Sequence, residues 1–225
     1  EWQDWKRFWQ SYEDYQKLAP VDKKADLKRL YPCIKDATAE TKIEPTYFYQ
    51  DSWAFEKIVK QSPLSHIDVG SNHKYVALLS KVVPVTMVDI RPLSLPLNTL
   101  NFIEGSILDL PFEDNSIESL SCLCVVEHIG LGRYGDPLDP HGSEKAIQEL
   151  KRVLKVGGRL YMSVPVGNET ITAFNAGRIF SQEETYNLLS PLKVVDEAYI
   201  VGKRLQKDFE YIGRFATTGL FELEK

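Results

Sequence analysis

The stretch His66-Ile67-Asp68-Val69-Gly70-Ser71-Asn72 decides the fold that we predict for this sequence. It is a short apolar run that ends in an acidic residue, a glycine and a turn. Such a turn places backbone N–H groups and a carboxylate at the carboxyl edge of a parallel sheet, where open α/β folds bind ligands. Asp89 follows Asp68 by 21 residues, at the end of the next apolar run. At this spacing a second carboxylate binds ribose hydroxyls, so the pair predicts a cofactor that carries a nucleoside.

Short apolar runs alternate with helical patterns from Thr46 onward. This alternation is typical of βαβ units and of a parallel sheet covered on both faces. The strands expected from it are residues 65–69, 83–89, 100–103, 117–126 and 159–164. An apolar helical stripe at 146–154 is expected to end at Gly157 and Gly158.

A further helix is expected from Ser181, where Glu184 completes a capping box. The β-like runs 192–200 and 215–223 have no convincing helix between them and are expected to pair antiparallel at one edge. The predicted fold class is therefore α/β. We expect a three-layer sandwich with a Rossmann-like, mostly parallel seven-stranded sheet, an antiparallel C-terminal edge strand and an N-terminal helical appendage.

The N-terminal appendage is predicted from large aromatic side chains at spacings of three and four residues. They are Trp2, Trp5, Phe8, Trp9, Tyr12 and Tyr15. The spacing predicts an amphipathic helix, followed by a second short helix between Pro20 and Pro32 and a linker at 35–45. The predicted domains are thus residues 1–45 and 46–225. Six packed aromatics bury about 150–250 Å² each, so the apolar face is expected to fold back onto the main domain, or to contact a second copy or another domain.

Composition narrows the function classes. The 225 residues are 43% hydrophobic and 26% charged, enough for one domain with an appendage. Lys and Arg total 27 against 32 Asp and Glu, which argues against nucleic acid as a partner. No apolar run reaches about 18 residues, so no transmembrane segment is expected. Because the three cysteines are few and odd in number, a disulfide framework is not expected, and a location in the reducing cytoplasm is. The first residue is Glu and not Met, so the sequence could be a piece of a longer chain.

Several segments follow the first turn in a recurring order. They are Asp68-Val69-Gly70, Asp89, residues 104–116 (EGSILDLPFEDNS), Val126-Glu127-His128 and residues 150–158 (LKRVLKVGG). As an ordered set they resemble the class I methyltransferases that use S-adenosylmethionine. A finer string, EHIGLGRYGDPLDP at 127–140, together with residues 47–51 and 174–176, resembles a bacterial domain family of unknown function often found with surface-polysaccharide genes.

The resemblance implies S-adenosyl-L-methionine as cofactor and O-methylation of a saccharide or small polar acceptor. Its implied cofactor-binding residues are Gln50, Asp68, Gly70, Ser71, Asp89, Ile90, Ser106, Ile107, Leu108 and Cys124. The sequence departs from the family pattern at Asn72 and Lys74, where the second and third glycines of the first motif commonly stand. It departs again at Ser106, where relatives often have an Asp that accepts from the adenine amino group.

The loop after the fourth expected strand concentrates titratable groups. Within 15 residues it holds Glu127, His128, Arg133, Tyr134, Asp136, Asp139 and His141. The loop also contains Gly130-Leu131-Gly132-Arg133-Tyr134-Gly135, which matches the dinucleotide fingerprint in letters. Two Asp-Pro pairs follow instead of a helix, so we expect an irregular loop without a dinucleotide.

Catalytic and acceptor-binding roles are expected at this loop and at the one after the fifth strand. His128 is the candidate general base or, alternatively, an orienting residue. Asp136 and His141 are further catalytic candidates. Together with Asp139 they could alternatively hold a Mg²⁺ ion that activates a hydroxyl group. Because Asp-Pro turns explain both aspartates without a metal, no metal is expected. The acceptor is expected to contact Arg133, Tyr134, Asn175 and Arg178.

The predicted function is that of an S-adenosylmethionine-dependent methyltransferase. Two alternatives stay open. One is a catalytically inactive scaffold with this fold in a larger glycan-synthesis protein or complex. The other is an NAD-linked sugar-nucleotide enzyme, which the acidic spacing favours and the glycine pattern of the first turn disfavours.

Overall fold

A computed structural model describes residues 1–225, which form two compact units, Glu1–Ile43 and Glu44–Lys225. The expected boundary fell two residues later. Helix α2 (Pro45–Gln61) opens the second unit with a proline at its first turn, and the Glu44 side chain accepts from Tyr47 N at 2.7 Å as its N-cap. The cap ties Glu44 to this helix.

The first unit contains the expected aromatic helix, α1 (Trp2–Leu18). The expected second helix is wrong: two single 3-10 turns, Val21–Lys23 and Leu27–Arg29, stand in its place. Gln16 explains the interruption, because its amide donates to Ala25 O at 2.6 Å and accepts from Ala25 N at 3.0 Å. Both backbone groups of Ala25 are thereby withdrawn from helical pairing. What covers the aromatic face of α1 stays a prediction.

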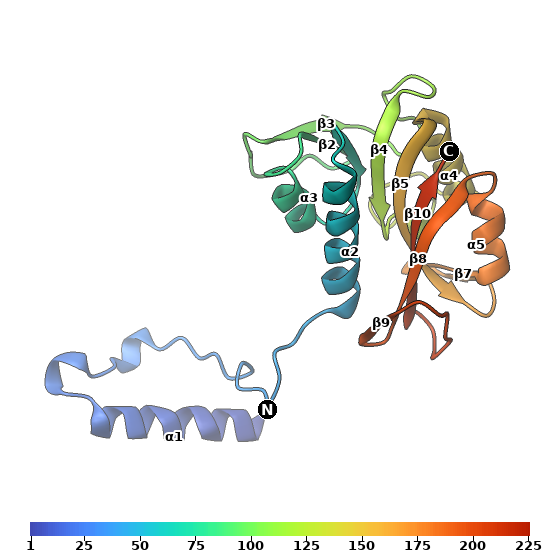
Figure 1. Cartoon of the computed structure of the whole chain (residues 1–225). Helices are drawn as coiled ribbons and strands as arrows, with labels where there is room; N and C mark the ends of the chain where they lie inside the picture. Colours follow the sequence, from blue (N-terminus) through green and yellow to red (C-terminus); the bar gives the residue numbers. More distant parts are fainter. The chain divides into compact units, whose positions relative to one another are not determined.

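A mostly parallel sheet forms the second unit, with the strand order β3-β2-β1-β4-β5-β10-β8-β9 (Figure 1). The strands are β1 (His66–Val69), β2 (Val85–Asp89), β3 (Leu100–Glu104), β4 (Ile117–Leu123), β5 (Leu154–Gly167), β8 (Lys193–Val201), β9 (Arg204–Gln206) and β10 (Thr217–Glu224). Strands β1 to β5 are parallel, whereas β10 is antiparallel to both β5 and β8. The Rossmann-like sheet and its antiparallel C-terminal pairing are confirmed. Strand β10 is not the edge strand that was expected: it lies between β5 and β8, and the short β9 pairs antiparallel with the end of β8 at the edge. The sheet has ten strands and not the seven expected, because short strands such as β9 were not recognised in the sequence.

Helices cover both faces of this sheet, as a three-layer sandwich requires (Figure 1). Helices α2 and α3 (His73–Leu79) pack on one face, and α4 (Gly142–Val153) and α5 (Gln182–Leu189) pack on the other. The side chains of β5 alternate between the two cores: Tyr161 packs with α2, and Leu160 and Met162 pack with α4. A short ribbon of β6 (Ile171–Ala173) and β7 (Gly177–Ser181) branches from the end of β5. None of the helices combines the length and apolar character that crossing a bilayer requires.

The border between α4 and β5 differs from the sequence prediction. The helix ends at Val153 and the strand begins at once with Leu154, although Gly157 and Gly158 were expected to end the helix. Leu154 pairs with Ile117, and this distant pairing outweighs the local helical periodicity. Gly158 is required by contact, since a Cβ there would lie 3.0 Å from Ile117 O.

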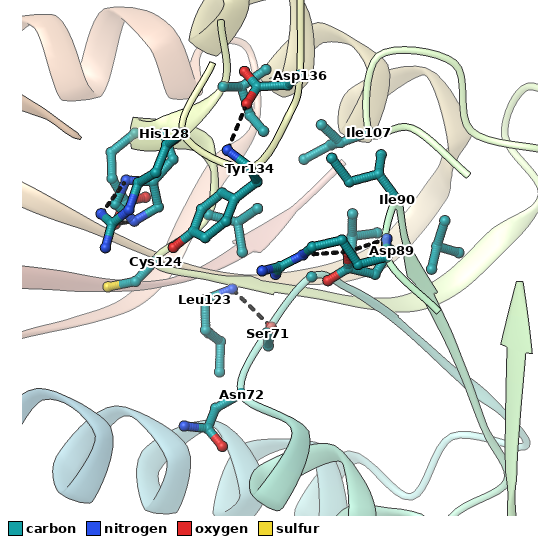
Figure 2. Close-up of a pocket in the computed structure, with 18 of the residues that line it drawn as sticks. Ser71, Asn72, Asp89, Ile90, Ile107, Leu123, Cys124, His128, Tyr134 and Asp136 are labelled. Carbon is teal, nitrogen blue, oxygen red and sulfur yellow. Dashed lines mark hydrogen bonds and ion pairs between the residues drawn. The ribbon is translucent and has the colours of Figure 1, made fainter. Parts of the chain in front are cut away.

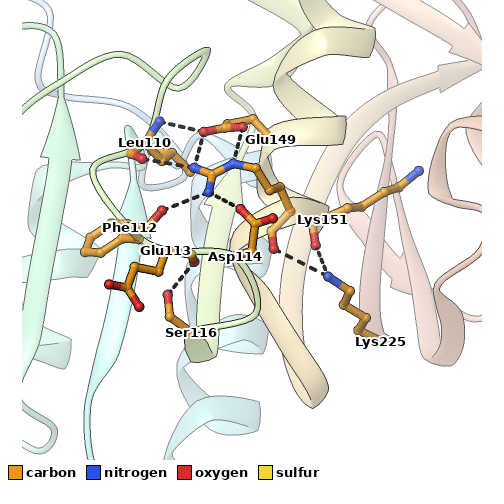
Figure 3. Close-up of polar contacts among 9 residues, drawn as sticks. Leu110, Phe112, Glu113, Asp114, Ser116, Glu149, Lys151 and Lys225 are labelled. Carbon is orange, nitrogen blue, oxygen red and sulfur yellow. Dashed lines mark hydrogen bonds and ion pairs between the residues drawn. The ribbon is translucent and has the colours of Figure 1, made fainter.

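One arginine joins two of the recurring motif segments, and we call its contacts the Arg152 network (Figure 3). Arg152 donates to the carbonyls of Leu110 and Phe112 and to the carboxylates of Asp114 and Glu149. Glu149 in turn accepts from Leu110 N at 2.8 Å. The network fixes the segment between β3 and β4 against α4. These motif residues therefore stabilise the fold.

Candidate functional site

A pocket of about 580 Å³ lies at the carboxyl ends of β1, β2 and β4, where the first turn predicted a ligand site. Figure 2 shows Asp89, Ile90 and Ile107 on one side of it and Cys124 and His128 on the other. The predicted site residues that line it are Gly70, Ser71, Asp89, Ile90, Ser106, Ile107, Leu108, Cys124, His128, Arg133, Tyr134 and Asp136. The predicted site residues outside its lining are Gln50, Asp68, His141, Asn175 and Arg178.

The turn after β1 accommodates the two departures from the glycine motif. Gly70 has φ +68°, and a Cβ there would meet the Val125 side chain at 3.1 Å, so this first glycine is required. Asn72 is the N-cap of α3, with its side-chain oxygen accepting from Lys74 N at 2.9 Å. The Lys74 side chain is exposed. Neither residue therefore disturbs the turn.

A buried chain of hydrogen bonds supports this turn from below. Asp68 accepts from Ser71 N at 3.1 Å and from Ser121 Oγ at 2.5 Å, while His66 bridges Ser121 and Ser119 at 2.8 and 2.7 Å. Burial raises the pKa of Asp68 to about 6 in spite of the donors from Ser121 and Ser71. Burial lowers the pKa of His66 to about 3, so its ring is neutral at pH 7. Asp68 thus positions the turn instead of lining the pocket.

The Asp89 carboxylate stands at the end of β2 with one oxygen engaged. Its Oδ1 accepts from Arg91 N at 2.8 Å and pairs with Arg91 Nε at 3.4 Å. Arg91 also lies over the Tyr134 ring, 4.3 Å from its centroid. The second carboxylate oxygen of Asp89 has no hydrogen bond within the chain, and the apolar side chains of Ile90 and Ile107 lie beside it. A carboxylate oxygen next to apolar walls suits the hydroxyls and the base of a nucleoside.

The loop at 127–141 is irregular, as predicted, and is built around Asp136. The carboxylate of Asp136 accepts from the backbone N–H groups of Gly130, Gly132 and Tyr134 at 2.7, 3.3 and 3.2 Å. Burial opposes ionisation of Asp136, but these N–H donors hold its pKa below the usual value. A Cβ at Gly130 would fall 2.0 Å from Asp139 O, so the fingerprint glycine serves a close backbone crossing.

The alternative Mg²⁺ arrangement is not assembled. Asp139 pairs with Lys145 at 2.6 Å, and the exposed His141 lies 3.6 Å from Glu144. Asp136 is held by backbone N–H groups instead. No group of three His, Cys, Asp or Glu side chains is positioned to hold a metal ion.

His128 lines the pocket from the short 3-10 turn Val126–His128. Its Nδ1 lies 3.3 Å from Arg133 Nη1 and its Nε2 lies 3.7 Å from Glu127 Oε1. The ring also packs edge-on against Tyr134. Burial, and next the charge of Arg133, lower the pKa of His128 to about 4. His128 is therefore neutral at pH 7 and only weakly basic.

Glu127 was in the titratable cluster but not among the predicted site residues. It is only 2% exposed and borders the pocket, and its Oε2 has no hydrogen-bond partner. Burial raises the pKa of Glu127 to about 8, so the carboxyl group is mostly protonated at neutral pH. The sequence contained a signal for its burial, because Glu127 lies among apolar residues, with Val125 and Val126 before it and Ile129 two positions after it, close to the end of an apolar strand.

Three predicted contacts lie elsewhere for physical reasons. The Arg178 guanidinium donates to three backbone carbonyls within residues 129–140 and so ties down the loop. Gln50 is fully buried and accepts from Ser163 Oγ at 2.8 Å. Asn175 is exposed in the turn between β6 and β7. Their roles in binding stay predictions.

Comparison with known families gives one match, "Caenorhabditis protein of unknown function, DUF268", over residues 112–198, which is less than half of the chain. No curated protein matches the sequence.

Solved structures of similar fold include two enzymes described as N-methyltransferases. One is a 1,6-didemethyltoxoflavin-N1-methyltransferase of Burkholderia thailandensis with bound S-adenosylhomocysteine, at 14% identity and TM-score 0.58, covering 79% of this chain and 78% of that one. Another is NodS of Bradyrhizobium japonicum WM9 in complex with S-adenosyl-L-homocysteine, at 15% identity and TM-score 0.58, covering 97% and 98%. A third, at 14% identity and TM-score 0.54 over 78% and 80%, is the [4+2]-cyclase SpnF. At these identities the likeness establishes the fold alone, and one fold hosts several reactions.

Proposed function

We propose that this chain is an S-adenosylmethionine-dependent methyltransferase that acts on a small polar acceptor. The observation that carries the proposal is the Asp89 carboxylate oxygen that has no partner, next to Ile90 and Ile107 in the pocket at the carboxyl ends of the strands. Two neighbours of the same fold are methyltransferases whose structures hold S-adenosylhomocysteine, which supports the choice of cofactor.

The residues of the pocket fit this cofactor. Asp89 would accept the ribose hydroxyls, Ile90 and Ile107 would flank the base, and the turn at Gly70 would approach the remaining chain of the cofactor closely. The Ser106 hydroxyl already accepts from Leu108 N at 3.1 Å, which leaves it a lone pair for the adenine amino group. When bound, S-adenosylmethionine supplies an electrophilic methyl group.

The acceptor would lie on the side of the pocket formed by His128, Arg133 and Tyr134. Arg133 donates to Ala176 O at 2.5 Å and lies 5.1 Å from the Tyr134 ring centroid, so its guanidinium is held in one orientation. Aromatic and cationic groups of this kind orient a polar molecule. The finer proposal, O-methylation of a saccharide in the cytoplasm during polysaccharide synthesis, rests on the resemblance of residues 127–140.

Calorimetry with S-adenosylmethionine, S-adenosylhomocysteine and NAD tests the proposal. The protein is expected to bind both sulfur nucleosides and not NAD. Asp89→Ala should weaken binding about 10- to 100-fold, the loss expected for a charge-assisted hydrogen bond. Asp109→Ala, at an exposed aspartate outside the pocket, is the matched control.

Two results would contradict it. Absence of binding of either sulfur nucleoside at millimolar concentration leaves the inactive scaffold as the better explanation. Binding of NAD alone favours the sugar-nucleotide enzyme.

A further inference from the structure

The Glu127 side chain is a carboxyl group that no contact of the fold explains. It is 2% exposed and borders the pocket, yet Oε2 lacks any hydrogen-bond partner. Burying a polar atom without a partner is destabilising, and most buried polar atoms in folded proteins avoid it. The fold therefore leaves a carboxyl oxygen of a pocket-lining residue unsatisfied, and a polar group of a ligand would satisfy it.

The backbone directs Glu127 to this position through an unfavourable conformation. Cys124, directly after β4, has φ +52°, which residues other than glycine rarely adopt. The following turn, Val126–His128, is fixed to α4 because Ser143 Oγ donates to Val126 O at 2.6 Å. Rigid elements on both sides thus hold the carboxyl group at the pocket.

The groups that face Glu127 leave it without a strong partner. Cys122 and Cys124 lie on its strand side, His128 is adjacent, Arg133 comes from the loop and Tyr47 from α2. Burial dominates and raises the pKa of Glu127 to about 8, although the Cys124 thiol and the Arg133 charge lower it. General bases work best with a pKa near the operating pH, and Glu127 is much closer to this than His128.

We infer that Glu127 binds the O–H or N–H group of the methyl acceptor and takes its proton, so that Glu127 and not His128 is the base of the proposed reaction. In this step the acceptor O–H or N–H bond breaks and the proton passes to a Glu127 carboxylate oxygen. The electron pair left on the acceptor forms the bond to the methyl carbon, while the electrons of the broken carbon–sulfur bond return to sulfur. The inference rests on the proposed function.

The acceptor is unidentified, so the test uses a probe that replaces it. Sinefungin is an analogue of S-adenosylmethionine in which a carbon atom replaces the sulfur and an amino group replaces the methyl group. An ammonium held against the Glu127 carboxyl group ionises it and releases its proton. With a pKa of about 8, the release is about 0.9 proton at pH 7, about 0.5 at pH 8 and about 0.1 at pH 9.

Calorimetry in buffers of different ionisation enthalpy measures this release in the full chain. Glu127→Gln should abolish it and lower the preference for sinefungin over S-adenosylhomocysteine at least tenfold, while S-adenosylhomocysteine still binds. Glu118→Gln, at an exposed glutamate of β4, the strand that precedes the turn of Glu127, should behave as wild type.

The outcomes separate this inference from the proposed function. If the wild-type protein binds neither nucleoside, the proposed function fails. If the wild-type protein binds both nucleosides but sinefungin binding releases no proton with a midpoint near pH 8, the role assigned to Glu127 is wrong. The role is also wrong if sinefungin releases as many protons from Glu127→Gln as from the wild-type protein. The wild-type pH series needs no variant, so it decides the matter even if Glu127→Gln does not fold.

Discussion

Replacing Glu127 by Gln should change the pH dependence of folding stability, whatever the reaction is. The folded protein holds the Glu127 proton with a pKa of about 8, against an ordinary value of 4.5 in the unfolded chain. The folded state therefore binds this proton more tightly. The stabilisation is complete below pH 4.5 and is lost as the pH rises to about 8, at about 1.4 kcal/mol per pH unit.

The magnitude follows from these two pKa values. Between pH 5 and pH 7 the wild-type protein should lose about 2–3 kcal/mol of unfolding free energy through Glu127 alone. A glutamine at this position does not titrate, so the variant keeps that free energy. Asp68 and His128, whose pKa values are also displaced, titrate in both proteins and cancel in the difference.

Urea denaturation followed by circular dichroism at pH 5, 6, 7 and 8 measures the difference. The stability of Glu127→Gln relative to wild type should rise by about 2–3 kcal/mol from pH 5 to pH 7. Glu113→Gln, at an exposed glutamate, should show no such trend. If the difference in stability between Glu127→Gln and wild type is independent of pH, or falls as the pH rises, then the Glu127 carboxylate is charged and paired in the folded protein. That result would refute the raised pKa of Glu127.

Three further predictions concern the framework of the pocket. Ser121→Ala should lower the unfolding free energy by about 1–3 kcal/mol in urea denaturation, because the buried Asp68 carboxylate loses its hydroxyl donor; an unchanged value contradicts this. Arg152→Ala should lower the melting temperature in calorimetry by several degrees and Arg152→Lys by less, since a lysine replaces only part of the Arg152 network; equal losses would refute the geometric argument. Gly130→Ala should make the loop at 127–141 sensitive to limited proteolysis, because the new Cβ would lie 2.0 Å from a backbone carbonyl oxygen. Gly135→Ala is the control: its Cβ would have no atom within 4 Å, so it should lower the unfolding free energy only by the backbone strain of about 1 kcal/mol. Equal proteolysis of the two variants would show that the crossing does not matter.

Local patterns predicted most of the sheet because apolar runs and turn residues act over a few positions. Asp89 is the last residue of β2, and Asp68 lies one residue before the end of β1, as expected for acidic residues that close apolar runs. The boundary at Leu154 was missed because it depends on pairing with Ile117, which is distant in sequence. Likewise, the helix expected before Pro32 is prevented by the side chain of Gln16.

The roles of the site residues were harder to predict because residue type does not reveal which partner satisfies it. Asp136 and Arg178 belong to types that bind ligands, but backbone N–H and carbonyl groups occupy them. Glu127 belongs to a type that is usually exposed, and only the packing of β4 and the following turn buries it. The sequence located the cluster, and the tertiary contacts decided which of its members remain available.

The position of β10 has a consequence for biosynthesis. Ribosomes make β8 before β10, yet β8 reaches the rest of the sheet only through β10. During translation β5 and β8 therefore present unpaired edges until residues 217–224 have left the exit tunnel, and exposed edges invite association with other nascent chains. Translation that stops before Thr217 therefore yields a polypeptide with two open sheet edges instead of a smaller folded unit, and chaperones and proteases act on such chains.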